Sequence, residues 1–272
     1  TKDSATITFN GLNTAQKLEY VQIIEPDTST SSGWDFCSDE IALAYAKGFL
    51  NNDELTTDDV DDTQKQQIIW SLILNQNSDA KVPTELGNVV AAKAEQIDAA
   101  LSKVAAEINF TELDNKNLLT VYEAGIYVFK AEEEGYTYKP MAAYVGFGEV
   151  DGYDYPSLVD TSVTAKKSST TIEKTVGDTD HAVAIGDIVT YTVEAYVPYI
   201  DANDTNKTFT ITDILDGSEY YLTGVGSQAT ITVEGYDDTI TFPAPTPTGD
   251  GKQTFTVNLT SLIDKQNTYE GH

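Results

Sequence analysis

The sequence predicts a mainly β protein made of two β-sandwich domains, the first of which carries a large helical insertion. Three observations lead to this prediction. Short segments of alternating apolar and polar residues, separated by turn residues, run along most of the chain. Between about 38 and 109 the apolar residues change to helical spacing. The stretch 166–170 has no apolar residue and separates two halves that are each long enough to bury a core.

The first domain is predicted to span residues 1–166. It starts with two strand patterns, Ala5–Phe9 and Lys17–Ile24. The insertion contains three stretches with apolar residues at helical spacing, namely Ser38–Gly48, Gln64–Leu74 and Thr84–Ile108. We expect the third of these to be one long amphipathic helix, and the sequence also allows a break in it near Gly87. Strand patterns return from Leu118 to Ala165.

The second domain is predicted to span residues 167–272 and to contain strands only. Its strand patterns are short and regularly spaced: Thr171–Val176, Asp187–Val197, Phe209–Asp213, Tyr220–Leu222, Gln228–Glu234, Thr239–Phe242 and Gln253–Leu259. This pattern is typical of an immunoglobulin-like sandwich. The residues after Asn267 look like a turn that leads into another strand. We therefore expect the sandwich to lack its last strand within this sequence.

The charge of the chain excludes several classes of function. Its 272 residues include 44 Asp and Glu against 16 basic residues, all of them Lys, for a net charge of −28. Nucleic acids and anionic lipid surfaces both require a basic face, so we expect neither as a partner. No apolar run reaches the length of about 18 residues that a membrane helix needs. The composition favours a self-repelling, soluble surface protein, here a mature or trimmed fragment, although charge alone fits any acidic soluble protein.

The sequence predicts no metal and no cofactor. Cys37 is the single cysteine, so an intrachain disulfide is impossible, and two histidines do not complete a zinc cluster. The loop Asp201–Asn206 has the spacing of oxygen ligands that suits calcium, but it lacks the closing bidentate Glu, which favours a polar hairpin loop. The acidic run Asp58–Asp62 has two interpretations, a cation site or favourable charges at a helix N-terminus, and we prefer the second.

Two residues of the second domain have ordinary interpretations when they are taken alone. Lys174 lies in a strand pattern, where a lysine usually packs its aliphatic chain on the sheet and exposes its ammonium to water. Asp213 closes a later strand pattern, where an aspartate usually starts a turn. Their residue types and spacing do not by themselves assign them any chemistry.

A set of motifs in a particular order gives the chain a family resemblance. In the first domain these motifs are Ala5–Leu12, Tyr20–Asp27, Gly33-Trp34, Gly125–Phe129 and Met141–Gly146. In the second domain they are Ile172-Glu-Lys-Thr175, Ile185–Val193, Val197-Pro198 and Phe209–Gly217. With this order and spacing, which cover nearly the whole chain, the sequence resembles the isopeptide-forming pilus subunits of Gram-positive bacteria, which sortases polymerise.

The resemblance implies an intramolecular amide bond in the second domain. Lys174 matches the lysine on the first strand that attacks an asparagine side chain on the last strand, and Asp213 matches the assisting carboxylate. A buried amine held against its target is a competent nucleophile, and a buried carboxyl group transfers the protons. The acceptor asparagine is expected beyond residue 272, since Asn258 lies one strand too early.

The resemblance also implies a bond between subunits. In the family, a lysine at the end of the N-terminal domain attacks the sortase-bound threonyl thioester of the next subunit, and it follows a Val-Tyr-Pro motif. The matching place here reads Val163-Thr-Ala-Lys166-Lys167, in which Thr-Ala replaces Tyr-Pro. Lys166 or Lys167 is the implied linking lysine, with Lys166 favoured. An exposed lysine at a domain junction is otherwise a solubilising charge.

We therefore expect a non-enzymatic structural subunit of a cell-wall-anchored, extracellular pilus of a Gram-positive bacterium. Its expected partners are other pilin subunits, a sortase and host surface ligands. The alternative is a tip or basal pilin that acts as an adhesin, whose helical insertion binds a host glycan or protein. A third hypothesis is a glycosidase, which would require a pocket with two facing carboxylates and aromatic walls.

Overall fold

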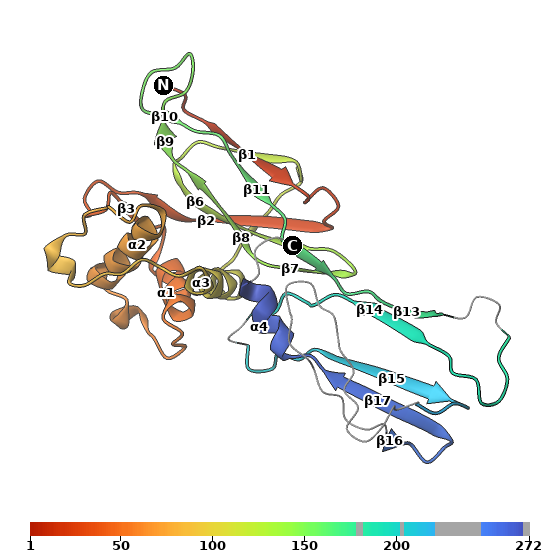
Figure 1. Cartoon of the computed structure of the whole chain (residues 1–272). Helices are drawn as coiled ribbons and strands as arrows, with labels where there is room; N and C mark the ends of the chain where they lie inside the picture. Colours follow the sequence, from red (N-terminus) through yellow and green to blue (C-terminus); the bar gives the residue numbers. More distant parts are fainter. Residues whose placement is uncertain (178–181, 202–203, 221–245, 269–272) are drawn as a thin grey trace. The chain divides into compact units, whose positions relative to one another are not determined.

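A computed structural model of the chain describes residues 1–177, 182–201, 204–220 and 246–268. These residues form a mixed α/β structure with more strand than helix, several small sheets and a helical region in the N-terminal part (Figure 1). The chain divides into two compact units, Thr1–Lys167 and Ser168–His272. No helix among the described residues is long and apolar enough to cross a membrane.

Two main sheets form most of the β part of the first unit. The larger one has the order β3-β2-β6-β8, and its strands are β2 (Lys17–Pro26), β3 (Trp34–Phe36), β6 (Gly125–Glu132) and β8 (Met141–Val145), with β4 (Thr111–Glu112) paired to β2. The smaller one has the order β11-β1-β5, and its strands are β1 (Ala5–Asn10), β5 (Leu118–Val121) and β11 (Thr161–Thr164). Three short strands complete the unit: β7 (Tyr136–Tyr138), β9 (Phe147–Gly148) and β10 (Ser157–Leu158).

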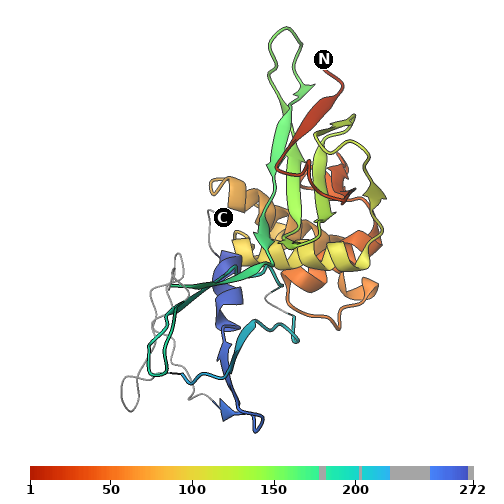
Figure 2. The ribbon, with the colours of Figure 1, turned by 90° about the vertical axis from the view of Figure 1, so that its right-hand side faces the viewer.

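Strand β6 shows why the larger sheet is covered on both faces. Successive side chains of a strand point to opposite faces. Tyr127 and Phe129 join one apolar cluster, which lies between the two sheets. Ile126 and Val128 join another, which is shared with the helices. The larger sheet is therefore the middle layer of the unit, with the helices on one side and the smaller sheet on the other (Figures 1 and 2).

The helical layer contains α1 (Asp39–Phe49), α2 (Asp62–Gln76) and α3 (Ala94–Glu107). Polar side chains define where the first two begin. The Ser38 hydroxyl accepts a hydrogen bond from the backbone N–H of Ile41 at 3.2 Å, and the Asp61 carboxylate accepts one from Gln64 at 2.8 Å. An N-cap of this kind satisfies a helix N–H group that has no partner within the helix. Asp61 thus caps α2, which confirms that the acidic run supplies helix-starting residues.

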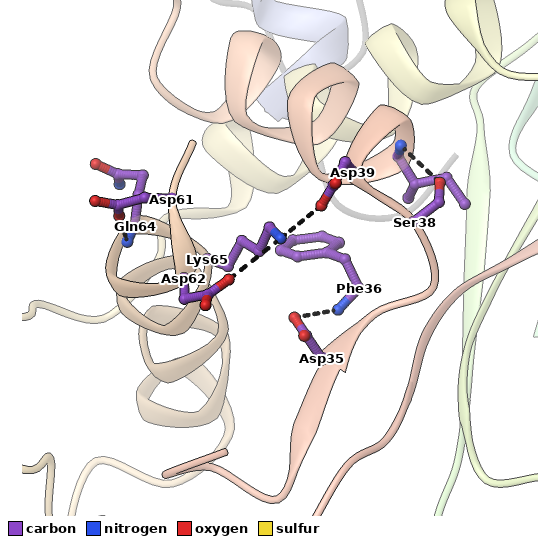
Figure 3. A network of polar contacts seen from close by, with 9 residues as sticks. Asp35, Phe36, Ser38, Asp39, Asp61, Asp62, Gln64 and Lys65 are labelled. Atoms are coloured by element: carbon purple, nitrogen blue, oxygen red, sulfur yellow. Dashed lines mark hydrogen bonds and ion pairs between the residues drawn. The ribbon is translucent and has the colours of Figure 1, made fainter. Parts of the chain in front are cut away.

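A lysine connects the starts of these two helices. Figure 3 shows the Lys65 ammonium between the carboxylates of Asp39 and Asp62, at 2.6 and 3.5 Å. Asp39 belongs to the first turn of α1 and Asp62 to the first turn of α2. Both carboxylates therefore lie where the helix dipole favours negative charge, and the Lys65 ammonium reduces the repulsion between them.

The prediction of one long helix from Thr84 to Ile108 is wrong. A short 3-10 helix, η2 (Thr84–Leu86), ends at Gly87, whose φ of +75° lies in the left-handed region. The chain then extends to Ala92, whose backbone N–H donates to the Ser71 carbonyl and whose carbonyl accepts from the Asn75 side chain, each at 2.9 Å. These contacts with α2 hold the segment in an extended form until α3 begins. A second 3-10 helix, η1 (Thr57–Asp59), precedes α2.

Gly48 in α1 is expected to be intolerant of any side chain. A Cβ atom at this position would lie 2.3 Å from the Ala99 carbonyl oxygen of α3, which is backbone and cannot move aside alone. Gly48→Ala should therefore force the two helices apart and destabilise the protein by about 1–3 kcal/mol, as overpacking does. Urea unfolding followed by far-UV circular dichroism would measure this loss. The matched control Gln76→Ala, at the exposed end of α2, should change stability by less than about 0.5 kcal/mol, and equal effects would contradict the close-packing argument.

The second unit contains two small sheets and one helix. In the first sheet, β13 (Ile172–Val176) pairs antiparallel with β14 (Tyr191–Ala195). In the second, β17 (Lys252–Asn258) lies between β15 (Thr210–Asp216) and β16 (Thr246–Pro247). The short strand β12 (Lys167–Ser169) spans the boundary of the units. Helix α4 (Ser261–Thr268) follows β17.

Helix α4 contradicts the prediction that the second domain contains strands only. Leu259, Leu262 and Ile263 are all buried, and the spacing of three and four residues suits one face of a helix. Leu259 and Leu262 form an apolar cluster with Val257, against which Phe209 and Phe255 pack. Burial of this face therefore favours a helix. The sequence alone did not predict it, because polar residues lie among these apolar ones.

The other strand predictions of this unit have mixed outcomes. The strand predicted over Asp187–Val197 is shorter than expected, because Asp187 closes a turn in which its carboxylate accepts from the Ala184 N–H at 2.7 Å. The strands predicted at Gln228–Glu234 and Thr239–Phe242 lie outside the described residues, as do Tyr221 and Leu222 and the residues after 268.

Candidate functional site

The structure brings Lys174 and Asp213 into direct contact. The Lys174 Nζ atom lies 2.6 Å from Asp213 Oδ1, although the two residues are 39 positions apart. Lys174 is the middle residue of β13, and Asp213 is the middle residue of β15. The contact therefore joins a strand of one small sheet of the second unit to a strand of the other.

An aromatic ring holds the Lys174 ammonium from a second direction. The ammonium lies 4.5 Å from the centroid of the Tyr191 ring, within cation–π distance. Lys174 pairs with Val193 in the β13–β14 register, so Tyr191 is its diagonal neighbour on the same face of the sheet. The strand register thus places the aromatic ring beside the ammonium.

Tyr220 holds the other side of the carboxylate. Its hydroxyl donates to Asp213 Oδ2 at 3.0 Å and to the Asp213 carbonyl oxygen at 3.1 Å, and its ring packs on Phe255 at 5.5 Å. Burial raises the pKa of the Tyr220 phenol, and the hydrogen bond to Asp213 raises it further, so the phenol is a hydrogen-bond donor at neutral pH. Each carboxylate oxygen of Asp213 therefore has its own donor.

The lysine and the aspartate are half-buried, whereas the amide chemistry implied by the sequence needs them inside a core. The Lys174 side chain is 33% exposed and that of Asp213 is 23% exposed. The apolar neighbours on the first sheet are exposed too, Ile172 by 58% and Val193 by 40%. In the described part of the chain, the ion pair thus lies at a partly exposed face of the β13–β14 sheet.

Asn258 is not brought to this pair. In the β15–β17 register, Asp213 pairs with Phe255, whereas Asn258 pairs with Thr210 at the other end of β15. Three residues along a strand correspond to roughly 10 Å, and an odd separation places Asn258 on the opposite face of the sheet. Its side-chain oxygen accepts from the Thr260 N–H at 3.0 Å, as at the start of a turn. The Asn258 side chain is therefore not the amide that faces the Lys174 amine.

Lys167 is engaged by several side chains of the first unit. Its ammonium lies 3.0 Å from Glu133 Oε2, donates to the Thr14 hydroxyl at 3.2 Å and lies 4.4 Å from the centroid of the Tyr136 ring. Burial alone would raise the pKa of Glu133, but the hydrogen bonds from Tyr138, Lys167 and Thr14 outweigh it and lower that pKa. Glu133 is therefore ionised and holds the Lys167 ammonium.

Lys166 has different surroundings. It is exposed, and its backbone carbonyl accepts from the Lys139 N–H at 2.9 Å, which fixes the main chain at this point. Among the described residues, no hydrogen bond or ion pair engages its side chain. Of the two adjacent lysines, Lys166 thus has the amine that a large reagent can reach, while the Lys167 amine is held by Glu133.

Sequence reasoning missed Tyr220, Tyr191 and Glu133. For Tyr191 a signal existed, because it lies on a predicted strand. It is two residues from Val193, the partner of Lys174, and therefore shares the face of Lys174. For Glu133 and Tyr220 no local signal existed. Glu133 belongs to an acidic turn, and Tyr220 follows β15 through a turn whose geometry only the folded chain shows.

No three His, Cys, Asp or Glu residues come together in a metal-binding arrangement within the ranges that the structure describes. Of the predicted calcium-like loop, Ala202 and Asn203 lie outside those ranges. We therefore assign no metal site, and the candidate site consists of the amine, the carboxylate and the two phenols described above.

Comparison with solved structures gives a distant likeness to backbone pilins of Gram-positive bacteria. The chain is similar to the T6 backbone pilin of serotype M6 Streptococcus pyogenes, with a TM-score of 0.42 and 13% identity over 97% of this chain and 51% of that one. It is also similar to the full-length major pilin SpaD from Corynebacterium diphtheriae, with a TM-score of 0.33 and 15% identity over 94% of this chain and 51% of that one. The chain spans about half the length of each pilin. No protein-family model and no curated protein matches the sequence.

Proposed function

We propose that this chain is a structural subunit of a sortase-assembled pilus on the surface of a Gram-positive bacterium, with two immunoglobulin-like domains that meet near residues 166 and 167. Its partners are other pilin subunits and a sortase. The observation that carries the proposal is the contact of 2.6 Å between the Lys174 ammonium and the Asp213 carboxylate, two residues that the sequence relates only through the family resemblance.

The proposed reaction joins Lys174 to an asparagine side chain. The neutral Lys174 amine attacks the amide carbon, and a C–N bond forms while the bond to the amide nitrogen breaks. Asp213 accepts a proton from the attacking amine and delivers it to the leaving nitrogen, which departs as ammonia. Atoms balance without an oxidant or a cofactor. Tyr220 keeps Asp213 oriented, because it occupies Oδ2 and leaves Oδ1 for the amine.

The partly exposed face of β13 and β14 is where the proposal places the acceptor asparagine. We place the acceptor asparagine on a strand beyond residue 272, which packs over this face. Such a strand would bury Ile172 and Val193 and would exclude water from the Lys174–Asp213 pair.

Intact-mass measurement on the natural full-length protein tests the crosslink. Amide formation releases one ammonia, so we expect the mass to be about 17 Da below that calculated from the sequence. Tandem mass spectrometry of a protease digest should then find a branched peptide that contains Lys174. A protein with its full calculated mass would overturn the crosslink, whatever its fold.

The same proposal assigns Lys166 as the amine that joins one subunit to the next. Its side chain is exposed on a fixed main chain, whereas the Lys167 ammonium is already bound by Glu133.

Lys166→Arg is expected to abolish the covalent high-mass ladder that wild-type cells show in denaturing gels, since a guanidinium does not attack a thioester under these conditions. Lys167→Arg is the matched control. It keeps the positive charge near Glu133 and should leave the ladder intact. A ladder that persists in Lys166→Arg and disappears in Lys167→Arg would reverse the assignment, and one that persists in the double variant would refute the role of the pair.

A further inference from the structure

A groove in the first unit lies outside the site described above. It lies between β2 with its partner β4 and the turn that connects β5 to β6, and its volume is about 550 Å³. Three of the residues that line it are tyrosines. Tyr20 comes from β2, Tyr127 from β6 and Tyr122 from the connecting turn. The Tyr20 and Tyr127 rings are stacked at 6.5 Å, whereas the Tyr122 ring is 78% exposed.

Two of the side chains that line the groove, Gln22 and Tyr127, are left with atoms that accept hydrogen bonds. The Gln22 amide uses its N–H groups on the carbonyls of Ile24 and Ala124, at 3.3 and 3.2 Å, so its oxygen is the atom left for a ligand. The Tyr127 hydroxyl donates to the Glu123 carbonyl at 2.9 Å and is left with its lone pairs. These two groups therefore favour a ligand that carries a hydroxyl donor in addition to its cation.

Charge selects among such ligands. Glu123 lines the groove, and none of the residues that line it is Lys or His. The whole chain has a net charge of −28, which draws cations toward it. Anionic ligands are therefore disfavoured, and a cation is favoured over a neutral ligand of the same shape.

We propose that this groove binds an organic ammonium ion on a short alkyl chain, with the cation against the exposed Tyr122 ring and close to the Glu123 carboxylate. Tyrosine rings attract cations through their negative faces, and a carboxylate beside them adds direct Coulomb attraction. The groove supplies one carboxylate, so it does not offer the pair of facing carboxylates that glycoside hydrolysis requires. The proposed activity is thus binding and not hydrolysis.

Choline is a suitable probe, and 3,3-dimethylbutan-1-ol is its uncharged isostere. We expect choline to bind in calorimetric or NMR titration with a dissociation constant on the order of 1 mM, and the isostere to bind at least about tenfold more weakly. Glu123→Gln should weaken choline binding about tenfold, and Tyr122→Ala should weaken it severalfold. Both positions are exposed, so neither change removes buried contacts.

Glu54→Gln is the matched control, because it removes the same charge from an exposed residue that does not line the groove. It should leave the dissociation constant within about twofold of wild type. Absence of saturable choline binding at about 20 mM, equal affinity for the isostere, or equal losses in Glu54→Gln and Glu123→Gln would each overturn the proposal. None of these outcomes depends on the amide crosslink or on polymerisation.

Discussion

Replacing Lys174 with arginine is expected to abolish the mass loss of about 17 Da in the full-length protein and to lower its stability strongly. The crosslink would close a loop of about a hundred residues or more, and in the chain-entropy model a covalent closure of that length contributes about 4–5 kcal/mol. An exposed or half-exposed ion pair contributes only about 0–1 kcal/mol. The loss should therefore far exceed what the Lys174–Asp213 ion pair itself provides. Intact mass and urea unfolding, measured on the same samples, check both parts.

The choice of arginine separates the covalent bond from the charge. The guanidinium of the Lys174→Arg variant would keep a cation beside Asp213 and over the Tyr191 ring, but it is not a nucleophilic amine. Asp213→Asn should likewise prevent the mass loss, because the side chain can no longer take up the proton. If either variant still loses ammonia at the wild-type rate, the assigned residues are wrong. If the arginine variant lacks the mass loss yet unfolds at the wild-type urea concentration, the crosslink does not stabilise the folded state.

Phe129→Ala is expected to be the most damaging single truncation of the first unit. Phe129 is fully buried between the two sheets, and its ring packs at 5.1 Å against Phe9 and at 6.4 Å against Tyr20. Removing the ring leaves a cavity that the surrounding strands cannot close. The free energy of unfolding should therefore fall by about 3–5 kcal/mol. Chemical unfolding of the whole chain, followed by the fluorescence of Trp34 and Trp70, would measure the change.

Phe147→Ala provides the comparison for this truncation. Phe147 is also a strand phenylalanine, but it is 50% exposed, and its ring lies 6.4 Å from that of Trp34. Its loss should cost about 1 kcal/mol. Similar costs for the two variants would contradict the assignment of the core to the space between the two sheets.

Some features of the fold were predictable because their causes are local. Ser38 and Asp61 act as caps through hydrogen bonds to N–H groups three residues ahead, so a short window of sequence contains both partners. Strand β6 was predictable because apolar and β-branched residues fill Gly125–Lys130. The sequence could not decide whether the helix is broken before α3, because Ala92 makes its contacts with Ser71 and Asn75 of a different helix.

The contact between Lys174 and Asp213 shows the opposite case. Neither residue has a pattern that points to the other, and family resemblance alone suggested their pairing. Their distance depends on how β13 pairs with β14, how β15 pairs with β17 and how the two sheets of the second unit meet. The position of Tyr220 on the second carboxylate oxygen depends on the same arrangement. A site formed by three separate segments is therefore visible only in the folded chain.

Residue types and their spacing act within a few positions, so they were enough to establish the strand-rich character of this protein, the placement of most of its helices in the first half and its strong negative charge. The folded chain was needed to show that α4 is a helix, that Lys167 rather than Lys166 binds Glu133, and that three tyrosines and Glu123 line one groove. These three features share one cause. Burial, ion pairing and ring stacking depend on which distant residues share a small volume, and that neighbourhood exists only after the chain has folded.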